Sequence, residues 1–124
     1  MATIQQFEDI QAWKDAIVLA DVVYTLSRDG AFSKDFGLRD QMRRAAVSIS
    51  SNIAEGFERR SDKSFQQFLS IANGSVGEIR CQLYVALDLG YISNEAFDEC
   101  QREAIQIGRM ITGLVQYLRS SSRS

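Results

Sequence analysis

The residues best suited to chemistry are the cations of one segment, residues 43–60, which reads "RRAAVSISSNIAEGFERR". An arginine pair stands at each end, and small or hydroxyl-bearing residues lie between the pairs. A guanidinium group donates several hydrogen bonds in a fixed fork that suits phosphate oxygens, so the segment suggests a helix that lies along nucleic acid. The possible nucleic-acid-binding residues are Arg39, Arg43, Arg44, Arg59, Arg60 and Lys63.

The same cations have a second interpretation, as a solvated surface with local ion pairs. Asp40 lies four residues before Arg44 and Glu55 lies four before Arg59, a spacing that stabilises a helix by a few tenths of a kcal/mol per pair. At about 100° per residue the arginines fall on different faces of a helix. The net charge is −2 and the pI about 5.1, so the whole molecule does not attract phosphate backbones. Binding to nucleic acid would therefore need a local patch of positive charge on the surface.

Signals for catalysis or for a bound metal are weak in this sequence. Histidine is absent, which excludes His-based triads and the Glu-x-x-His ligand pairs of di-iron bundles. The two cysteines form no CxxC pair, and "NGSVGE" lies within a predicted helix rather than after a strand. Cys81 and Cys100 could lie level on adjacent helices, where a disulfide is conceivable, but reduced packing thiols are the favoured interpretation. We expect no enzyme, no metal and no cofactor.

The elements that must position these residues are four helices. The chain has no proline, and its apolar residues recur at alternating steps of three and four, as in bundle helices. Ser61 and Ser93 are predicted N-caps, and Gly90 is predicted to end the third helix. The predicted helices span residues 7–27, 36–58, 62–89 and 94–119. We expect an all-α, up-down antiparallel four-helix bundle over residues 1–119 and a flexible tail over 120–124.

Small residues predict a close contact between the second and third helices. The tight joint near Arg60 pairs residues whose numbers add to about 120, which places Ala45 and Ala46 opposite Ser75 and Gly74. Glycine within a helix costs roughly 1 kcal/mol relative to alanine, a cost that close approach of two backbones would offset. A cleft for a ligand or a partner is the alternative. The packing residues are predicted to be Ala45, Ala46, Asn52, Gly56, Gly74 and Ser75, with Asn52 buried and bonded across the interface.

Apolar residues beyond the core stripes predict self-association. The first helix spreads its apolar surface over more than one stripe, and the second and third carry apolar residues at their flanks. More apolar surface than one bundle can bury usually marks a contact between subunits. The predicted subunit interface comprises Val18, Val22, Val47, Ala54, Phe57, Cys81, Tyr84 and Val85.

Four stretches resemble a known family. They are "FEDIQAW", "GLRDQMRRAAVSISSNIAEGFER", "FQQFLSIANGSVGEIRCQL" and "LGYIS", which together cover nearly the whole chain in order. They resemble the bacterial four-helix-bundle proteins first found encoded in intervening sequences of 23S ribosomal RNA genes. That family commonly has proline where this chain has Ser50, so a helix kink there is not expected.

The resemblance implies a bundle that assembles as a homopentameric ring. It also implies a possible link to nucleic acid, because a relative that serves retroelements is thought to bind nucleic acid and a reverse transcriptase. The leading hypothesis is a non-enzymatic, ring-forming interaction module with RNA or DNA as a possible ligand. A scaffold that binds another protein, with no nucleic-acid role, is the alternative. The N-terminus has no signal-peptide pattern and no apolar run is long enough to span a bilayer, so we expect a cytoplasmic protein without membrane contact.

Overall fold

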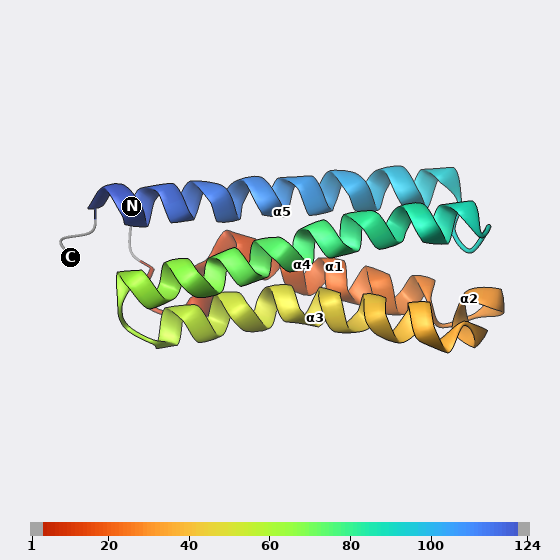
Figure 1. Ribbon diagram of the computed structural model, residues 1–124, viewed down its shortest axis with the longest axis horizontal. Helices are drawn as coiled ribbons and strands as arrows, with labels where there is room; N and C mark the ends of the chain where they lie inside the picture. Colours follow the sequence, from red (N-terminus) through yellow and green to blue (C-terminus); the bar gives the residue numbers. More distant parts are fainter. Residues whose placement is uncertain (1–3, 122–124) are drawn as a thin grey trace.

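Four long helices run antiparallel along the molecule in up-down-up-down order (Figure 1). The computed structural model describes residues 4–121. Each long helix packs on the next along the chain, and α1 also packs on α5, so that α1 and α4 lie on a diagonal. The predicted all-α four-helix bundle is confirmed. The long helices are α1 (Gln11–Leu26), α3 (Phe36–Glu58), α4 (Asp62–Asp88) and α5 (Asn94–Ser121).

The apolar stripes of these helices meet along the bundle axis. Leu19 of α1, Ile49 of α3 and Leu83 of α4 are completely buried, and Ile107 of α5 is almost so. Fully burying a side chain of this size stabilises the folded state by about 1.5–3 kcal/mol. The spacing of apolar residues thus determines which face of each helix turns inward.

The predicted helix boundaries at the two short joints are confirmed. Ser61 Oγ accepts a hydrogen bond from the backbone N–H of Ser64 at 3.1 Å, and Ser93 Oγ accepts one from Ala96 at 3.0 Å. Gly90 follows α4 with a φ of 77°, in the left-handed region that glycine tolerates. Arg60 has a φ of 63° in the joint between α3 and α4, which is uncommon for a residue with a Cβ.

The joint after α1 is more ordered than expected. It contains a short helix, α2 (Gly30–Lys34), in a connection where no helix was predicted. Phe32 of α2 is buried and stacks on Tyr91, with ring centroids 5.2 Å apart. The Tyr91 hydroxyl donates to Asp35 Oδ2 at 2.9 Å, and this bond is the main reason why the pKa of Tyr91 is raised. This contact closes one end of the bundle.

Both ends of the described chain also differ from expectation. The first predicted helix divides into a 3-10 turn, η1 (Phe7–Asp9), and α1, because Ile10 adopts an extended conformation between them. The last helix, α5, continues to Ser121, so the predicted tail begins too early. Residues 122–124 of that tail lie outside the described residues. Within residues 4–121, no helix is both long and apolar enough to cross a membrane.

Candidate nucleic-acid interface

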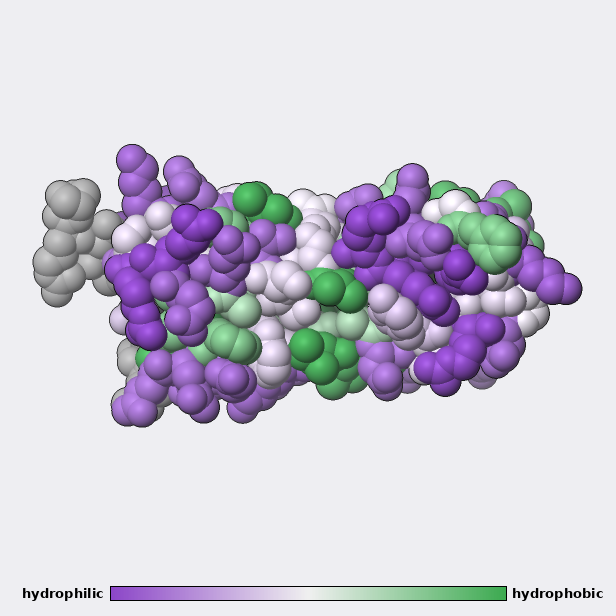
Figure 2. Space-filling model, turned by 90° about the horizontal axis from the view of Figure 1, so that it is seen from below, coloured by the Kyte–Doolittle hydropathy of each residue, from purple (hydrophilic) through white to green (hydrophobic). Residues whose placement is uncertain are grey.

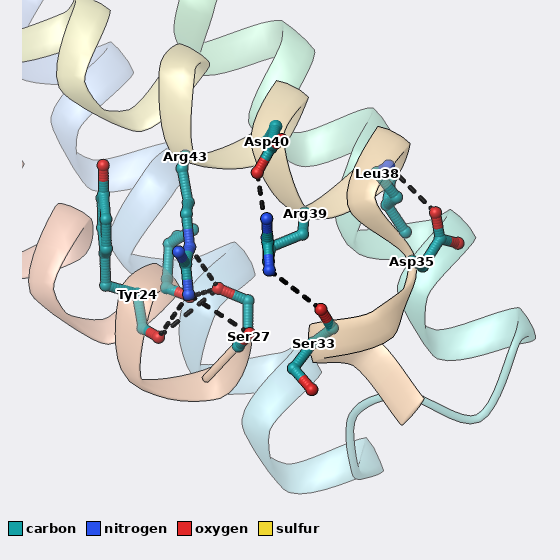
Figure 3. Close-up of polar contacts among 9 residues, drawn as sticks. Tyr24, Ser27, Ser33, Asp35, Leu38, Arg39, Asp40 and Arg43 are labelled. Atoms are coloured by element: carbon teal, nitrogen blue, oxygen red, sulfur yellow. Dashed lines mark hydrogen bonds and ion pairs between the residues drawn. The ribbon is translucent and has the colours of Figure 1, made fainter. Parts of the chain in front are cut away.

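Arg43 closes the C-terminal end of α1 (Figure 3). Its Nε donates to Ser27 Oγ at 2.9 Å, and its Nη2 donates to the carbonyl oxygens of Ser27 at 3.2 Å and Tyr24 at 3.4 Å. These carbonyls belong to the last turn of α1 and its C-cap, where no intrahelical donor remains. A cation there also opposes the partial negative charge of the helix end. Arg43 therefore has a structural partner within its own chain.

Arg39 makes a similar contact with α2 (Figure 3). Its Nη1 donates to the carbonyl oxygen of Ser33 at 2.9 Å, and its Nε donates to Asp40 Oδ1 at 2.9 Å. The predicted pairing of Asp40 with Arg44 is therefore wrong, because the carboxylate is bonded to its sequence neighbour instead. The hydrogen bond from Arg39 holds the pKa of Asp40 below its usual value.

The cations at the other end of α3 are exposed and paired locally. Arg59 Nη2 lies 2.8 Å from Glu55 Oε2, which confirms the predicted pairing one helical turn apart. Arg60 Nη2 lies 3.7 Å from Glu58 Oε1. Exposed ion pairs of this kind contribute at most about 1 kcal/mol. These two guanidinium groups remain free to exchange their partners for other anions.

Four of the six predicted cations also lie over aromatic rings of their own chain. A guanidinium placed this way is attracted to the face of the ring, and the ring covers one of the two planar faces of the guanidinium. The distances from guanidinium carbon to ring centroid are 4.8 Å for Arg39 over Phe36, 4.5 Å for Arg43 over Tyr24, 4.9 Å for Arg59 over Phe68 and 5.3 Å for Arg60 over Phe57.

The two remaining cations, Arg44 and Lys63, are exposed. Among the described residues, neither takes part in an ion pair or lies over an aromatic ring. Arg44 and Arg59 are separated by about 22 Å along the axis of α3. One copy of the chain therefore presents two separate groups of cations, one toward each end of α3, instead of a single basic patch.

The tightest glycine contact between α3 and α4 occurs at Gly56. A Cβ built on this buried glycine would lie 2.6 Å from Phe68 Cβ and 3.0 Å from Phe65 Cδ1. Both distances are shorter than a normal contact, so only glycine allows the two helices to approach this closely here. Ala45 and Ala46 are also buried, as members of the core.

The predicted close contact at Gly74 is wrong. Gly74 is exposed, and a Cβ built on it would meet nothing within 4 Å. Gly74 lies about 100° around α4 from the buried Ser75, on the side of the helix that faces solvent. Ser75 is hydrogen-bonded to Ser48, Oγ to Oγ at 2.9 Å, whereas the sequence paired it with Ala45. The two helices therefore meet about one turn away from the level that the sequence predicted.

Asn52 does not bridge the two helices as predicted. It is half-buried, and its Nδ2 donates to the carbonyl oxygen and to Oγ of Ser48 at 2.8 and 2.9 Å. Its short side chain thus reaches the preceding turn of α3 and not α4. The bond across the interface is made by Ser48 and Ser75, and Asn52 supports it by orienting Ser48.

Apolar side chains remain exposed along one face of α4. Six residues fall within a sector of about 80° on this helix, and we call them the α4 outer face. The large hydrophobic members, Ile71, Val85 and Leu89, are 53%, 43% and 51% exposed. Tyr84, beside this sector, is 58% exposed and contacts the ring of Phe97 at a centroid distance of 4.9 Å. The α4 outer face comprises Ile71, Gly74, Glu78, Cys81, Val85 and Leu89.

A second apolar face lies along the boundary of α1 and α3. Tyr24 and Val47 line one shallow groove, together with Arg43 and Arg44. Hydrophobic side chains gather near the middle of the bundle surface shown in Figure 2, between hydrophilic groups toward its two ends. We call Ile17, Tyr24, Val47 and Ala54 the α1–α3 face. Of the other predicted interface residues, Val22 and Phe57 are half-buried against the core, and Val18 borders a groove with α5.

Comparison with known proteins identifies the chain. The sequence profile of the 23S rRNA-intervening sequence protein family matches residues 8–113. The chain belongs to this family. A crystal structure of a protein of unknown function from the S23 ribosomal protein family of Bacteroides thetaiotaomicron is similar, with a TM-score of 0.77 and 21% sequence identity. The alignment covers 85% of this chain and 95% of that one, which establishes a shared fold. No curated protein matches the chain.

Cysteine, aspartate and glutamate side chains are the groups of this family member that could hold a metal ion. In the described part of the chain, no group of three or more Cys, Asp or Glu residues is placed to hold a metal ion. Cys81 and Cys100 are free thiols, the first exposed and the second buried. Burial, with smaller contributions from Glu103 and Glu99, raises the pKa of Cys100 to about 11, which keeps it protonated and unreactive.

The sequence did not predict one groove of this family member. It lies between α4 and α5, has a volume of about 520 Å³, and is lined by Arg80 and Arg109. Three helical glycines, Gly77, Gly108 and Gly113, also line it. Arg80 and Arg109 are single arginines in two separate helices, so they form no cluster of positive charge along the sequence. The three helical glycines were the sequence feature that could have indicated this groove.

Proposed function

We propose that this protein is a non-enzymatic interaction module whose copies assemble into a closed ring, with five subunits as the expected number. The observation that carries the proposal is the α4 outer face, where Ile71, Val85 and Leu89 are about half exposed on one side of a single helix. Exposed apolar residues that repeat along one helix face are suited to packing against another helix. Burying them against a second copy would remove this surface from water.

The relation between the two apolar faces favours a ring over a two-fold dimer. The α1–α3 face belongs to one edge of the bundle, whereas α4 lies diagonally across from α1. If the α4 outer face of one copy contacts the α1–α3 face of the next, the interface joins two different surfaces. Such head-to-tail contacts generate rings when the rotation closes.

Complementary variants test this arrangement by multi-angle light scattering. Val47→Glu and Val85→Glu each place a charge in one face, so each variant alone is expected to be monomeric. When mixed at high concentration they are expected to form heterodimers, because each retains the face that the other lacks. Gln116→Glu, which adds the same charge at an exposed site on α5, serves as the control and stays assembled. A monomeric wild-type protein, or no heterodimer in the mixture, would overturn the proposal.

Nucleic acid is the second candidate ligand, favoured by Arg44 and Lys63, two exposed cations that form no ion pair among the described residues. A ring would repeat these cations around its circumference, so that separate groups on one copy become a series on the assembly. RNA binding should then weaken as salt rises, and the Arg44→Met and Lys63→Met double variant should reduce that salt dependence. The absence of any RNA binding at low salt would exclude this role and leave a scaffold that binds only proteins.

A further inference from the structure

The groove between α4 and α5 contains two arginines without acidic partners. Neither Arg80 nor Arg109 forms an ion pair within residues 4–121, and the residues that line the groove include no carboxylate. The other lining side chains that carry polar atoms are neutral: Asn73, Thr112 and Gln116. The groove therefore carries an excess of positive charge in a protein whose net charge is −2.

Arg80 is held in a defined orientation. Its Nε donates to Gln101 Oε1 at 3.1 Å, and Gln101 Nε2 donates to the Arg80 carbonyl oxygen at 2.9 Å. Gln101 is only 8% exposed, so a buried amide is used to position an arginine whose Nη groups have no hydrogen-bond partner in the described chain. A pre-oriented guanidinium loses little conformational entropy when it binds an anion.

The glycines keep the floor of the groove at the level of the helix backbones. A Cβ on Gly108 would lie 3.3 Å from Asn73 Oδ1, a tight contact that the Asn73 side chain would have to relieve by shifting. A Cβ on Gly77 or Gly113 would meet nothing within 4 Å, so packing does not require glycine at these two sites. Alanine at these two sites would favour the helix, yet its methyl group would enter the groove. The space is thus open to a ligand, and Val76 and Ile105 add an apolar wall.

We propose that this groove binds a phosphate group carried by a nucleotide unit, with Arg80 and Arg109 on the phosphate and the glycine floor beneath the base. Charge-assisted hydrogen bonds from two guanidinium groups suit phosphate oxygens, and an apolar surface beside them suits the flat face of a base. The groove is on the opposite side of the bundle from the α1–α3 face, so the proposal does not depend on Arg44 or on self-association by that face.

Titration of the full-length protein with three probes tests the proposal and identifies the source of the phosphate. The probes are inorganic phosphate, uridine monophosphate and a short single-stranded oligouridine, followed by the NMR amide signals of Gly77, Gly108 and Gly113. Signals that respond to uridine monophosphate indicate a free nucleotide, and signals that respond only to oligouridine indicate RNA. Both results support the groove. A response to inorganic phosphate alone, or none at these glycines, overturns the proposal.

Variants separate binding from folding. Arg80→Met and Arg109→Met are each expected to weaken binding of the responding probe about tenfold. Arg102→Met removes an exposed arginine of α5 outside the groove and should leave binding unchanged. Gly77→Ala should raise the melting temperature while it weakens binding, a combination that damage to the fold cannot produce. Equal affinity in Arg80→Met, Gly77→Ala and the wild type would refute the assignment.

Discussion

Replacement of Gly56 by alanine should destabilise the protein, although alanine is the better helix former. The added Cβ would lie 2.6 Å from Phe68 Cβ, and both atoms are fixed directly to their backbones. No change of rotamer can relieve this overlap, so α3 and α4 must move apart. These two helices share the most extensive interface of the bundle, which makes the displacement costly.

The magnitude follows from two opposing contributions. Alanine gains about 1 kcal/mol over glycine within a helix. Overpacking a tight interface costs about 1–3 kcal/mol, and an overlap with an atom that cannot rotate away takes the upper part of that range. We expect Gly56→Ala to lower the free energy of unfolding by about 2 kcal/mol and the melting temperature by about 8 °C.

Gly77→Ala is the matched control, because its added Cβ meets nothing within 4 Å. It should raise the free energy of unfolding by about 1 kcal/mol. Urea unfolding followed by circular dichroism, at one fixed protein concentration, measures both changes and removes the effect of assembly on apparent stability. If Gly56→Ala stabilises the protein as much as Gly77→Ala does, the contact between α3 and α4 is not as close as described.

Four further measurements probe other parts of the bundle. Gln82 is buried and its Oε1 has no hydrogen-bond partner, so Gln82→Met should raise the free energy of unfolding by about 1 kcal/mol in urea titrations. In the monomeric Val47→Glu variant, a thiol reagent should modify Cys81 in the folded protein and Cys100 only after unfolding. Because the pKa of Cys100 is raised from 9.0 to about 11, the free energy of unfolding should be unaffected by this thiol below pH 9 and fall as pH rises to 11. Arg43→Met should destabilise the protein by about 1–2 kcal/mol, because it removes the donor to Ser27 Oγ and to the Ser27 carbonyl oxygen, whereas Arg44→Met should change stability by less than about 0.5 kcal/mol.

The arrangement of the four long helices could be predicted because it depends on local patterns. Apolar spacing identifies the inner face of each helix, and Ser61, Ser93 and Gly90 mark boundaries through interactions that span only a few residues. Short joints then require sequential helices to be antiparallel neighbours. The exception is α2, whose stability comes from the contact between Phe32 and a residue almost sixty positions away, Tyr91.

The candidate site could be predicted only in part, because a contact between two helices depends on the axial level at which they meet as well as on which of their faces meet. The contact between α3 and α4 was predicted, but at a level that differs by about one turn, so that Ser75 meets Ser48. Gly74 was predicted on the wrong face of α4, because it lies on the solvent side, where a Cβ would meet nothing within 4 Å. The partners of Arg43 are backbone carbonyl groups at the end of another helix, α1. No sequence pattern predicts a contact of this kind, because every residue has a carbonyl group.

The sequential order of the helices has a consequence for how the chain folds. The most extensive interface, between α3 and α4, joins segments separated by a joint of only a few residues, so its formation closes a small loop. We expect this pair to form the folding nucleus and the contact between α1 and α5 to form late, since it alone among the long-helix neighbours joins opposite ends of the described chain. Such a low contact order places folding in the microsecond-to-millisecond range. Rapid folding of each copy would precede any encounter between copies.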